Sequence, residues 1–259
     1  MKKFYLIAAL ALSTLAASAQ QRLLLSTYNG TNLEKFDGKT CQVTVSRYVF
    51  TGWNTVALPF ALTEDEVNEV FGSDCKLEKL VDAEQAGDKV VISFQDCKAG
   101  GMEANTPYIL YYTGEAGTKR IAKNALVADA DPTISIMVKG SVETVTMSGA
   151  KAKLAGAGLY GVLAKDNSEA KFVKVGDTAN IFYATRCYIK LSSGNATPLV
   201  TRHLAANETT GIAAVAGNNE VVDVYTVGGV KVASKVKASA LNSMQPGIYV
   251  VNGQKVLVK

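Results

Sequence analysis

The feature that most constrains this chain is a period of two in its apolar residues. Five segments alternate or are rich in Val, Ile, Tyr, Phe and Thr: residues 41–50, 89–94, 108–113, 133–138 and 171–175. These residue types favour β-strands. Clusters of Gly, Asp, Asn and Ser separate them at intervals of roughly ten residues, which is typical of an antiparallel sandwich or barrel rather than of βαβ units. We therefore predict an all-β fold with an antiparallel β-sandwich body.

One segment departs from this pattern and predicts a short helix. Thr63 is followed by three acidic residues, and Val67, Val70 and Phe71 lie at helical spacing before Gly72. Thr63 and Glu66 have the spacing of a capping box, in which each side chain accepts a hydrogen bond from the other residue's backbone N–H. The acidic residues suit a helix N-terminus, so they need no catalytic role.

The first nineteen residues have the three parts of a secretory signal peptide. Lys2 and Lys3 precede an apolar run over residues 4–15, and Ala17-Ser18-Ala19 supplies small residues for cleavage after Ala19. The run is shorter than the ~20 residues that span a bilayer, and no later segment reaches that length. We expect an exported chain without a transmembrane segment, with an uncleaved anchor as the alternative.

The expected mature chain has a small net charge and enough apolar residues for a packed core. Removing the two leader lysines from 27 basic residues leaves 25, against 23 acidic ones. This balance is too small for the electrostatic footprint of a nucleic-acid binder. A hydrophobic content of 48% is ample for a packed core. We expect no nucleic-acid partner and no cofactor.

The domain boundaries follow from turn composition and from one repeated signature. Residues 104–109 (ANTPYI) and 184–189 (ATRCYI) both lead from a small-residue turn into Tyr-Ile, which suggests a body over 20–205 with two similar halves, 41–120 and 121–205. Residues 206–220 are rich in small residues and predict a linker. Residues 221–259 form a separate C-terminal segment.

Four cysteines remain after the leader: Cys41, Cys75, Cys97 and Cys187. An even number in an exported protein permits two disulfides, with three possible connectivities. We favour Cys75 with Cys97, the closest in sequence, which leaves Cys41 with Cys187; buried free thiols are the alternative. With His203 as the only histidine and no Cys-x-x-Cys, we predict no metal site.

Trp53 is the only tryptophan and the one candidate for ligand binding. On a strand over residues 52–60, Trp53, Thr55 and Ala57 share one face and Asn54, Val56, Leu58 and Phe60 share the other. Core packing is the favoured role for Trp53. A platform that stacks on a sugar is the alternative.

The C-terminal segment predicts a β-hairpin. Residues 247–251 and 254–258 are strand-like and are joined by Asn252-Gly253, the pair that a type I′ turn favours. An isolated hairpin is only marginally stable, so it should pair with the strands near 221–234 or with the sandwich.

The order GWNTVALPF, acidic helix, ANTPYILYY, KGSVETVTM, GLYGVL and ATRCYIKL resembles an uncharacterised module of exported proteins from gut and oral Gram-negative bacteria. The tail is similar to the Ig-like C-terminal sorting domain of the type IX (Por) secretion system. That resemblance implies the secretion machinery as a partner and an outer-membrane-associated or extracellular location reached through the periplasm. It rests on Tyr225, Gly228, Gly229, Gly247, Tyr249, Asn252, Gly253, Lys255 and Lys259.

The residues that could carry catalysis form no recognisable set. His203 has no G-x-S-x-G elbow before it. Our main hypothesis is an exported, non-enzymatic module that binds a carbohydrate, a host protein or an envelope component. The first alternative is a structural envelope or filament subunit assembled through terminal strands. The second is a hydrolase with two carboxylates among Asp82, Glu84, Asp88 and Asp96.

Overall fold

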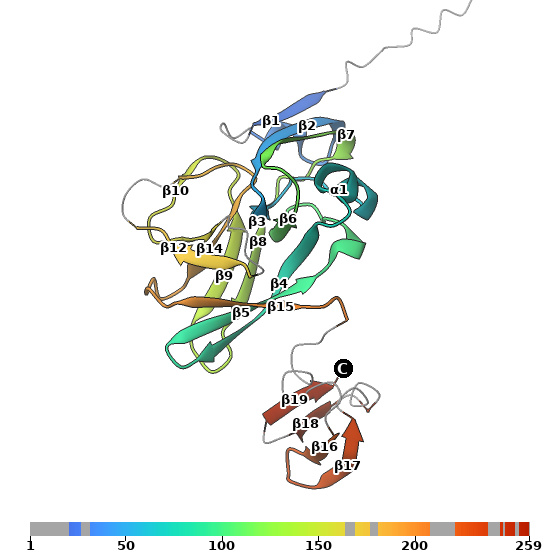
Figure 1. Cartoon of the computed structure of the whole chain (residues 1–259), viewed down its shortest axis with the longest axis vertical. Helices are drawn as coiled ribbons and strands as arrows, with labels where there is room; N and C mark the ends of the chain where they lie inside the picture. Colours follow the sequence, from blue (N-terminus) through green and yellow to red (C-terminus); the bar gives the residue numbers. More distant parts are fainter. Residues whose placement is uncertain are drawn as a thin grey trace, which may run out of the picture.

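The structure is a computed structural model of residues 1–259, in which residues 21–26, 32–163, 169–176, 181–207, 221–237, 244–245, 247–251 and 254–258 are described. Strands form most of it, and the predicted all-β class is confirmed (Figure 1). Within the described residues, no helix combines the length and apolar character needed to cross a membrane.

Three large sheets make up the main body. The first sheet has the order β1 (Arg22–Ser26), β2 (Thr40–Val49), β7 (Gly117–Leu126). The middle sheet has the order β15 (Leu199–Leu204), β5 (Lys89–Asp96), β4 (Lys76–Ala86), β6 (Tyr108–Tyr112), β3 (Gly52–Val56). The third sheet has the order β12 (Lys171–Lys174), β11 (Tyr160–Leu163), β14 (Cys187–Leu191), β9 (Thr144–Gly149), β8 (Thr133–Met137), and a short ladder pairs β10 (Leu154–Ala155) with β13 (Ile181–Phe182).

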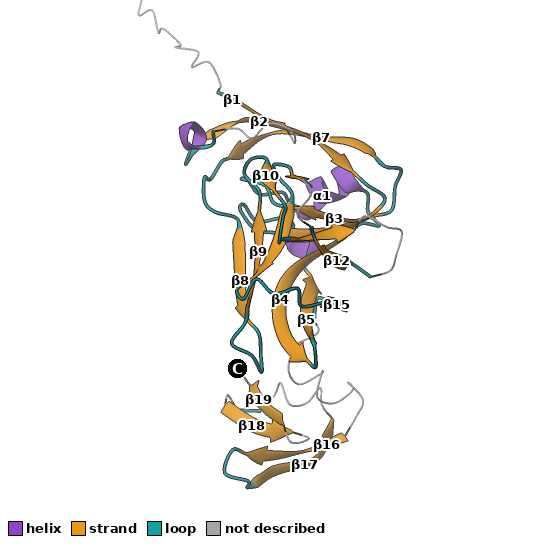
Figure 2. Ribbon diagram, turned by 90° about the vertical axis from the view of Figure 1, so that its left-hand side faces the viewer, coloured by secondary structure: helices purple, strands orange, loops and turns teal. Residues whose placement is uncertain are grey.

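The middle sheet is covered on both faces, which explains the apolar run around Trp53. All five residues of β3 are buried. Trp53 and Ala57 belong to a core cluster shared with the third sheet, whereas Val56 and Leu58 belong to a second cluster shared with the first sheet and the helix. The predicted division of residues between the two faces of this strand is therefore confirmed. Figure 2 shows the β8–β9 pair opposite β4 and β5, as in a sandwich.

Two edge strands pair in parallel, which the prediction of an antiparallel body did not include. β1 runs parallel to β2, and β15 runs parallel to β5. The predicted halves, 41–120 and 121–205, also exchange strands, because β7 spans their boundary and β15 completes a sheet built mainly from the first half.

The predicted helix is present as α1 (Glu64–Phe71). Thr63 and Glu66 form the expected capping box, and Gly72 ends the helix with φ +88°. Val67 and Phe71 bury the apolar side of α1 in the cluster shared with the first sheet. Two single turns of 3-10 helix, η1 (Glu34–Phe36) and η2 (Lys98–Gly100), complete the body.

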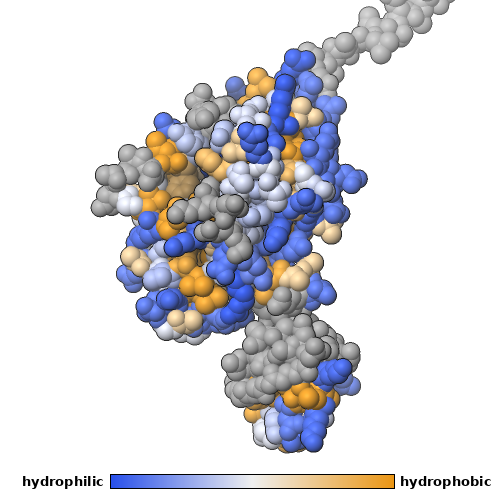
Figure 3. All heavy atoms as spheres, in the orientation of Figure 1, coloured by the Kyte–Doolittle hydropathy of each residue, from blue (hydrophilic) through white to orange (hydrophobic). Residues whose placement is uncertain are grey.

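The C-terminal segment forms a sheet of its own in the order β17 (Lys231–Lys237), β16 (Val221–Thr226), β18 (Gly247–Val251), β19 (Gln254–Val258). The predicted hairpin strands are present, and Val251 pairs with Gln254 across a two-residue connection. Asn252 and Gly253 themselves, like residues 208–220 of the expected linker, lie outside the described residues. Val222, Val224 and Val251 form the small core of this sheet. Figure 3 shows apolar atoms among hydrophilic ones on its surface.

Candidate binding site

One described pocket is a groove beside the end of the third sheet. Its cavity volume is about 360 Å³, which falls in the range of small-molecule sites. The loops that follow Ala128 and Gly149 form its walls, and Tyr188 of β14 contributes an aromatic ring. An adjacent slot shares Pro132, Ala150 and Lys151 with the groove, but its cavity volume of about 20 Å³ has room for little more than a water molecule. Of these two described pockets, the groove is the one with room for a small ligand.

Three polar side chains meet in the groove through strand register. Ser148 of β9 pairs with Thr133 of β8 on one side and with Tyr188 of β14 on the other. The hydroxyls of Thr133 and Ser148 lie 3.2 Å apart. Because the neighbouring residue Cys187 points into the core, Tyr188 points outward. The three side chains therefore form a row of hydroxyl groups and an aromatic ring across the sheet, which we call the Thr133–Ser148–Tyr188 row.

Further polar and aromatic groups extend this row. The ring of Tyr188 lies 5.5 Å from that of Phe182, with the planes tilted by 51°. On the next register row along the sheet, the hydroxyls of Ser135 and Thr146 lie 3.1 Å apart. Hydroxyl groups can each donate and accept hydrogen bonds, so this face can bind groups of either kind.

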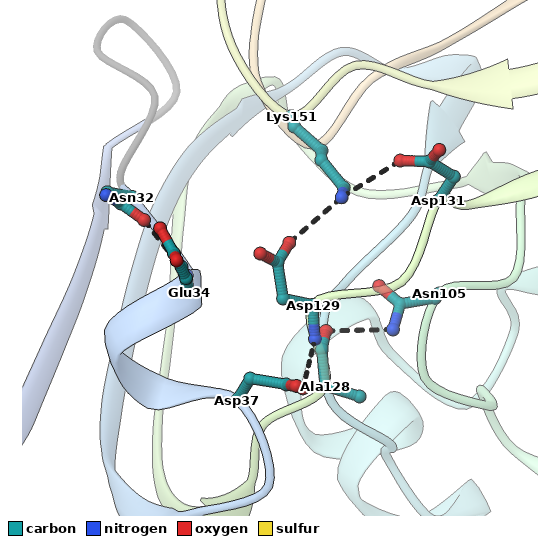
Figure 4. Close-up of polar contacts among 8 residues, drawn as sticks. All are labelled: Asn32, Glu34, Asp37, Asn105, Ala128, Asp129, Asp131 and Lys151. Carbon is teal, nitrogen blue, oxygen red and sulfur yellow. Dashed lines mark hydrogen bonds and ion pairs between the residues drawn. The ribbon is translucent and has the colours of Figure 1, made fainter.

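Lys151 lines the groove and is held by two carboxylates. Its Nζ lies 2.9 Å from Oδ1 of Asp129 and 2.9 Å from Oδ1 of Asp131 (Figure 4). The hydrogen bond to Asp129 and the second one to Asp131 raise the pKa of Lys151, against the opposing effect of burial. The ammonium group occupies the space between the two carboxylates, where a cation shared by Asp129 and Asp131 would sit. In the described part of the chain no group of three or more His, Cys, Asp or Glu is suited to a metal ion.

Side-chain hydrogen bonds to the backbone hold the loop that carries Asp129. The side-chain amide of Asn105 donates to the carbonyl of Ala128 at 2.9 Å, and Oδ1 of Asp37 accepts from the N–H of Asp129 at 2.9 Å (Figure 4). Asn32 likewise accepts from the N–H of Glu34 nearby. The carboxylates are therefore presented by a braced loop, which is the condition for a pre-formed site.

The repeated signature noted in the sequence has a structural counterpart beside the groove. Asn105 has φ +54° and Thr185 has φ +68°, so both turns enter their strands through a left-handed residue. The carbonyl of Thr185 accepts from the N–H of Ala57 at 3.0 Å. The N–H of Thr185 donates to the carbonyl of Ala150 at 2.9 Å. A left-handed β-branched residue is strained. The Thr185 turn joins the middle sheet to the groove wall.

Gly149 allows the third sheet to approach β3 closely. A Cβ atom at this position would lie 2.6 Å from Cβ of Ala57 and 2.9 Å from Cγ of Pro132. Atoms do not approach so closely, so the groove wall can occupy its place only with glycine at position 149.

Arg47 is a buried cation that links β2 to β3 and to the Thr185 turn. It is 1% exposed, and it donates to the carbonyls of Thr55 and Thr185 at 2.7 and 3.2 Å. Burial, with a smaller effect from the positive charge of Arg186, lowers the pKa of Arg47 to about 9. Thr55 also links β3 to β14, because its hydroxyl accepts from the N–H of Cys187 at 2.8 Å. These bonds tie together the three sheets.

Trp53, the residue singled out from the sequence, is not part of the groove. It is 1% exposed, and its indole contacts His203 and Tyr111 with ring centroids 4.7 and 5.1 Å apart. A sugar-stacking platform needs an accessible ring face, so Trp53 has the core-packing role. His203 binds Glu78 through Nδ1 at 2.6 Å and accepts from the N–H of Ala170 through Nε2 at 3.3 Å.

The structure contains neither of the expected disulfides, because all four cysteines are free thiols. Cys41 and Cys187 belong to the two different core clusters. The N–H of Cys97 donates to Leu77, which places Leu77 rather than Cys75 opposite it on the neighbouring strand. Burial raises the pKa of Cys97 and of Cys187 to about 12. These cysteines are therefore packed as small apolar residues.

The carboxylates proposed for hydrolysis are engaged with cations in two cases. Asp82 lies 2.6 Å from Nζ of Lys139, and Glu84 lies 2.6 Å from Nη2 of Arg202. Asp88 and Asp96 lie at the two ends of β5, in the turn before it and at its last residue. None of the four lines the groove.

The residues of the tail that resemble a sorting segment lie in the C-terminal sheet. Tyr225 is in β16, Gly247 and Tyr249 are in β18, and Lys255 is in the backbone of β19. Gly228 and Gly229 form the turn between β16 and β17, where Gly229 has φ +83°. Asn252, Gly253 and Lys259 lie outside the described residues.

Sequence reasoning missed Arg47 and the groove residues. The alternation in β2 could have revealed Arg47, since it occupies the inward position after Cys41, Val43 and Val45. Thr133, Ser148 and Tyr188 carry no local signal, because only long-range register brings them together. No protein-family model, curated protein or solved structure matches this chain.

Proposed function

We propose that this protein is an exported, non-enzymatic binding module and that the groove takes a saccharide. The observation that supports this is the Thr133–Ser148–Tyr188 row in a groove of about 360 Å³. A sugar presents hydroxyl groups at its edges and C–H groups on its faces. The hydroxyls of Thr133 and Ser148 can exchange hydrogen bonds with the sugar hydroxyl groups, and the ring of Tyr188 can stack on the C–H groups.

The charges around the groove favour an uncharged ligand. Lys151 is already paired with Asp129 and Asp131, and the only other charged residue in the wall is Lys153. A strongly anionic or cationic ligand would find its counter-charge largely engaged. A neutral polyol needs hydrogen-bonding groups instead, and the row supplies them.

The binding test uses the protein beginning at Gln20. We expect it to bind one or more neutral oligosaccharides on a glycan array and in calorimetric titration. Tyr188→Ala and the double variant Thr133→Ala/Ser148→Ala should each weaken binding at least about tenfold, or ~1.4 kcal/mol. Val200→Ala is the matched control, because Val200 is 40% exposed on β15 outside the groove. Binding that survives both groove variants, or no binding to any glycan, contradicts the proposal.

We also propose that the leader and the C-terminal sheet direct the chain to the cell surface or the medium by way of the periplasm. The supporting features are the tripartite leader and the tail residues that resemble a sorting domain. The tail forms a sheet that pairs only with itself among the described strands, as a separately recognised segment would. Its test is the tail deletion described in the Discussion.

A further inference from the structure

The Thr133–Ser148–Tyr188 row continues onto one more strand of the third sheet. Tyr160 of β11 pairs with Ile189 of β14 in antiparallel register, so Gly161 lies beside Tyr188. Because Tyr160 is buried in the core, Gly161 lies on the same outward face as Tyr188. The row therefore crosses four strands, in the order β8, β9, β14, β11.

An aromatic ring fills the place that Gly161 leaves open. A Cβ atom on Gly161 would lie 3.2 Å from Cζ of Phe182, so the ring of Phe182 packs directly over the glycine. Phe182 lies on β13, and its ring centroid is 5.5 Å from that of Tyr188. Both rings are partly exposed. The fourth position of the row is therefore occupied by the ring of Phe182.

The groove runs along this row rather than along the strands. The described residues that line it include all three members of the Thr133–Ser148–Tyr188 row but neither Ser135 nor Thr146 of the next row. One wall reaches Leu154 of β10, an exposed residue that pairs with Phe182. The groove therefore leads from hydroxyl groups at one end to the apolar pair Leu154 and Phe182 at the other.

We propose that the groove takes a linear oligosaccharide of at least three units, laid across the strands from Thr133 to Phe182. This inference rests on the proposed saccharide binding and specifies the class of saccharide. Neighbouring strands lie about 4.8 Å apart, so the four strands of the row place its two ends roughly 14 Å apart, much further than a single sugar ring reaches. Only a chain of several units can contact both ends.

The row also selects the shape of the chain. Thr133 offers a hydroxyl group to the polar edge of one sugar unit, whereas Phe182 and Leu154 offer an apolar surface to the C–H face of another. Chains linked through equatorial bonds, as in cellulose, stay extended and present a ring face at every unit. Chains of the starch type curl away from a straight line. We therefore expect an extended, equatorially linked chain.

The test is a chain-length series measured by calorimetric titration of the protein beginning at Gln20. The probes are oligomers of one to four units from cellulose, xylan, mannan and chitin, with malto-oligosaccharides as the curled comparison. At least one extended series should bind, with an affinity that rises about fivefold or more from two units to three and changes little from three to four. The malto-oligosaccharides should show no such rise.

Variants at the two ends of the row test the length directly. Phe182→Ala and Thr133→Val should each reduce the ratio of three-unit to two-unit affinity to about twofold or less. Ile181→Ala is the matched control, because Ile181 is exposed, precedes Phe182 on β13 and points to the other face. It should keep the ratio of the wild type. Thr133 is exposed on the edge strand β8, so Thr133→Val tests the row even if Phe182→Ala melts at a lower temperature.

The outcomes separate this inference from the saccharide proposal. If glycans bind but no extended series does, or if the affinity does not rise from two units to three, the saccharide proposal stands and the three-unit site is overturned. An unchanged ratio in both end variants overturns it as well. If no glycan binds at all, both proposals fall.

Discussion

The imidazole of His203 lies against the indole of Trp53, with ring centroids 4.7 Å apart and planes inclined by 18°. Two hydrogen bonds orient the ring, because Nε2 accepts from the N–H of Ala170 and Nδ1 therefore donates to Glu78. This stack joins β3 to β15, the two opposite edges of the middle sheet. The only tryptophan and the only histidine of the chain thus act together in packing.

Replacing Trp53 should destabilise the whole body. Trp53→Ala removes a fully buried indole from the cluster between the middle and third sheets, so we expect a loss of about 3–5 kcal/mol in the free energy of unfolding. Urea denaturation followed by circular dichroism measures it. Met137→Ala, at a side chain 72% exposed on β8, should change the stability by less than about 0.5 kcal/mol. Equal losses in the two variants would contradict the packing role.

Glu66 should make the stability depend on pH. Burial alone would raise its pKa, but hydrogen bonds from Lys123 and Thr63 outweigh burial and lower the pKa of Glu66. A lowered folded-state pKa stabilises the protein above the unfolded value of about 4.3, and this contribution disappears as the pH falls through the folded-state pKa. Glu66→Gln should therefore cost about 0.3–1 kcal/mol at pH 7 and progressively less below pH ~4.

Unfolding curves at several pH values test this prediction. Glu69→Gln on the same helix is the matched control, because Glu69 is exposed and lies outside the capping box. A difference between wild type and Glu66→Gln that grows on acidification would have the wrong sign.

Gly149→Ala should strain the contact between β9 and β3. The new methyl group would overlap Ala57 and Pro132, so we expect a loss of about 1–3 kcal/mol in the free energy of unfolding. Ala57→Gly in the same chain should recover part of that loss, with a coupling energy of at least about 0.5 kcal/mol. Gly176→Ala meets no atom within 4 Å and serves as the control. Strict additivity of the two substitutions would refute the close approach.

The cysteines should titrate as four free thiols. Denatured, unreduced protein should react with about four equivalents of a thiol reagent, because the structure holds no disulfide among them. The folded protein should react slowly, since burial raises the pKa of Cys97 and Cys187 and keeps the thiolate rare near neutral pH. Finding almost no thiol after denaturation would restore the disulfide prediction.

Deleting residues 247–259 tests whether the stability of the body depends on the tail. The deletion removes β18 and β19, which pair only with β16 and with each other among the described strands, so the melting of the body should be unchanged. We expect the truncated protein to be folded but retained in the periplasm, as shown by cell fractionation with a thermal melt.

Val251→Asp is the matched point variant for this deletion, because it disrupts the small core of the C-terminal sheet at full length. A truncated protein that aggregates would mean that the tail supports the body. One that stays folded and reaches the surface at the normal level would remove the export role.

Local patterns predicted those parts of the fold that depend on neighbouring residues. The two faces of β3, the capping box of Thr63 and the hairpin of residues 247–258 all follow from spacing along the chain. β4 was missed, because its sequence KLEKLVDAEQA carries five charged residues and is interrupted by a register shift between Leu80 and Asp82. Such a segment does not read as a strand until its neighbours β5 and β6 are known.

The candidate site was not predictable in the same way. Thr133, Ser148 and Tyr188 are ordinary strand residues whose meeting depends on the order of β8, β9 and β14 in the third sheet. Trp53 attracted attention by its rarity, yet a middle sheet covered on both faces hides it. Arg47 shows the converse, since a charged residue that keeps the inward phase of a strand can be part of the core.

The late position of β15 has a consequence for how the chain is made. Leu199 begins this strand 103 residues after Asp96 ends β5, its partner, and together they complete the middle sheet. A ribosome that has released only the first half of the protein has produced a sheet with an open edge, and long-range closure of this kind is slow. The middle sheet therefore cannot be completed until residue 204 has emerged, so this sheet closes late in the synthesis of the chain.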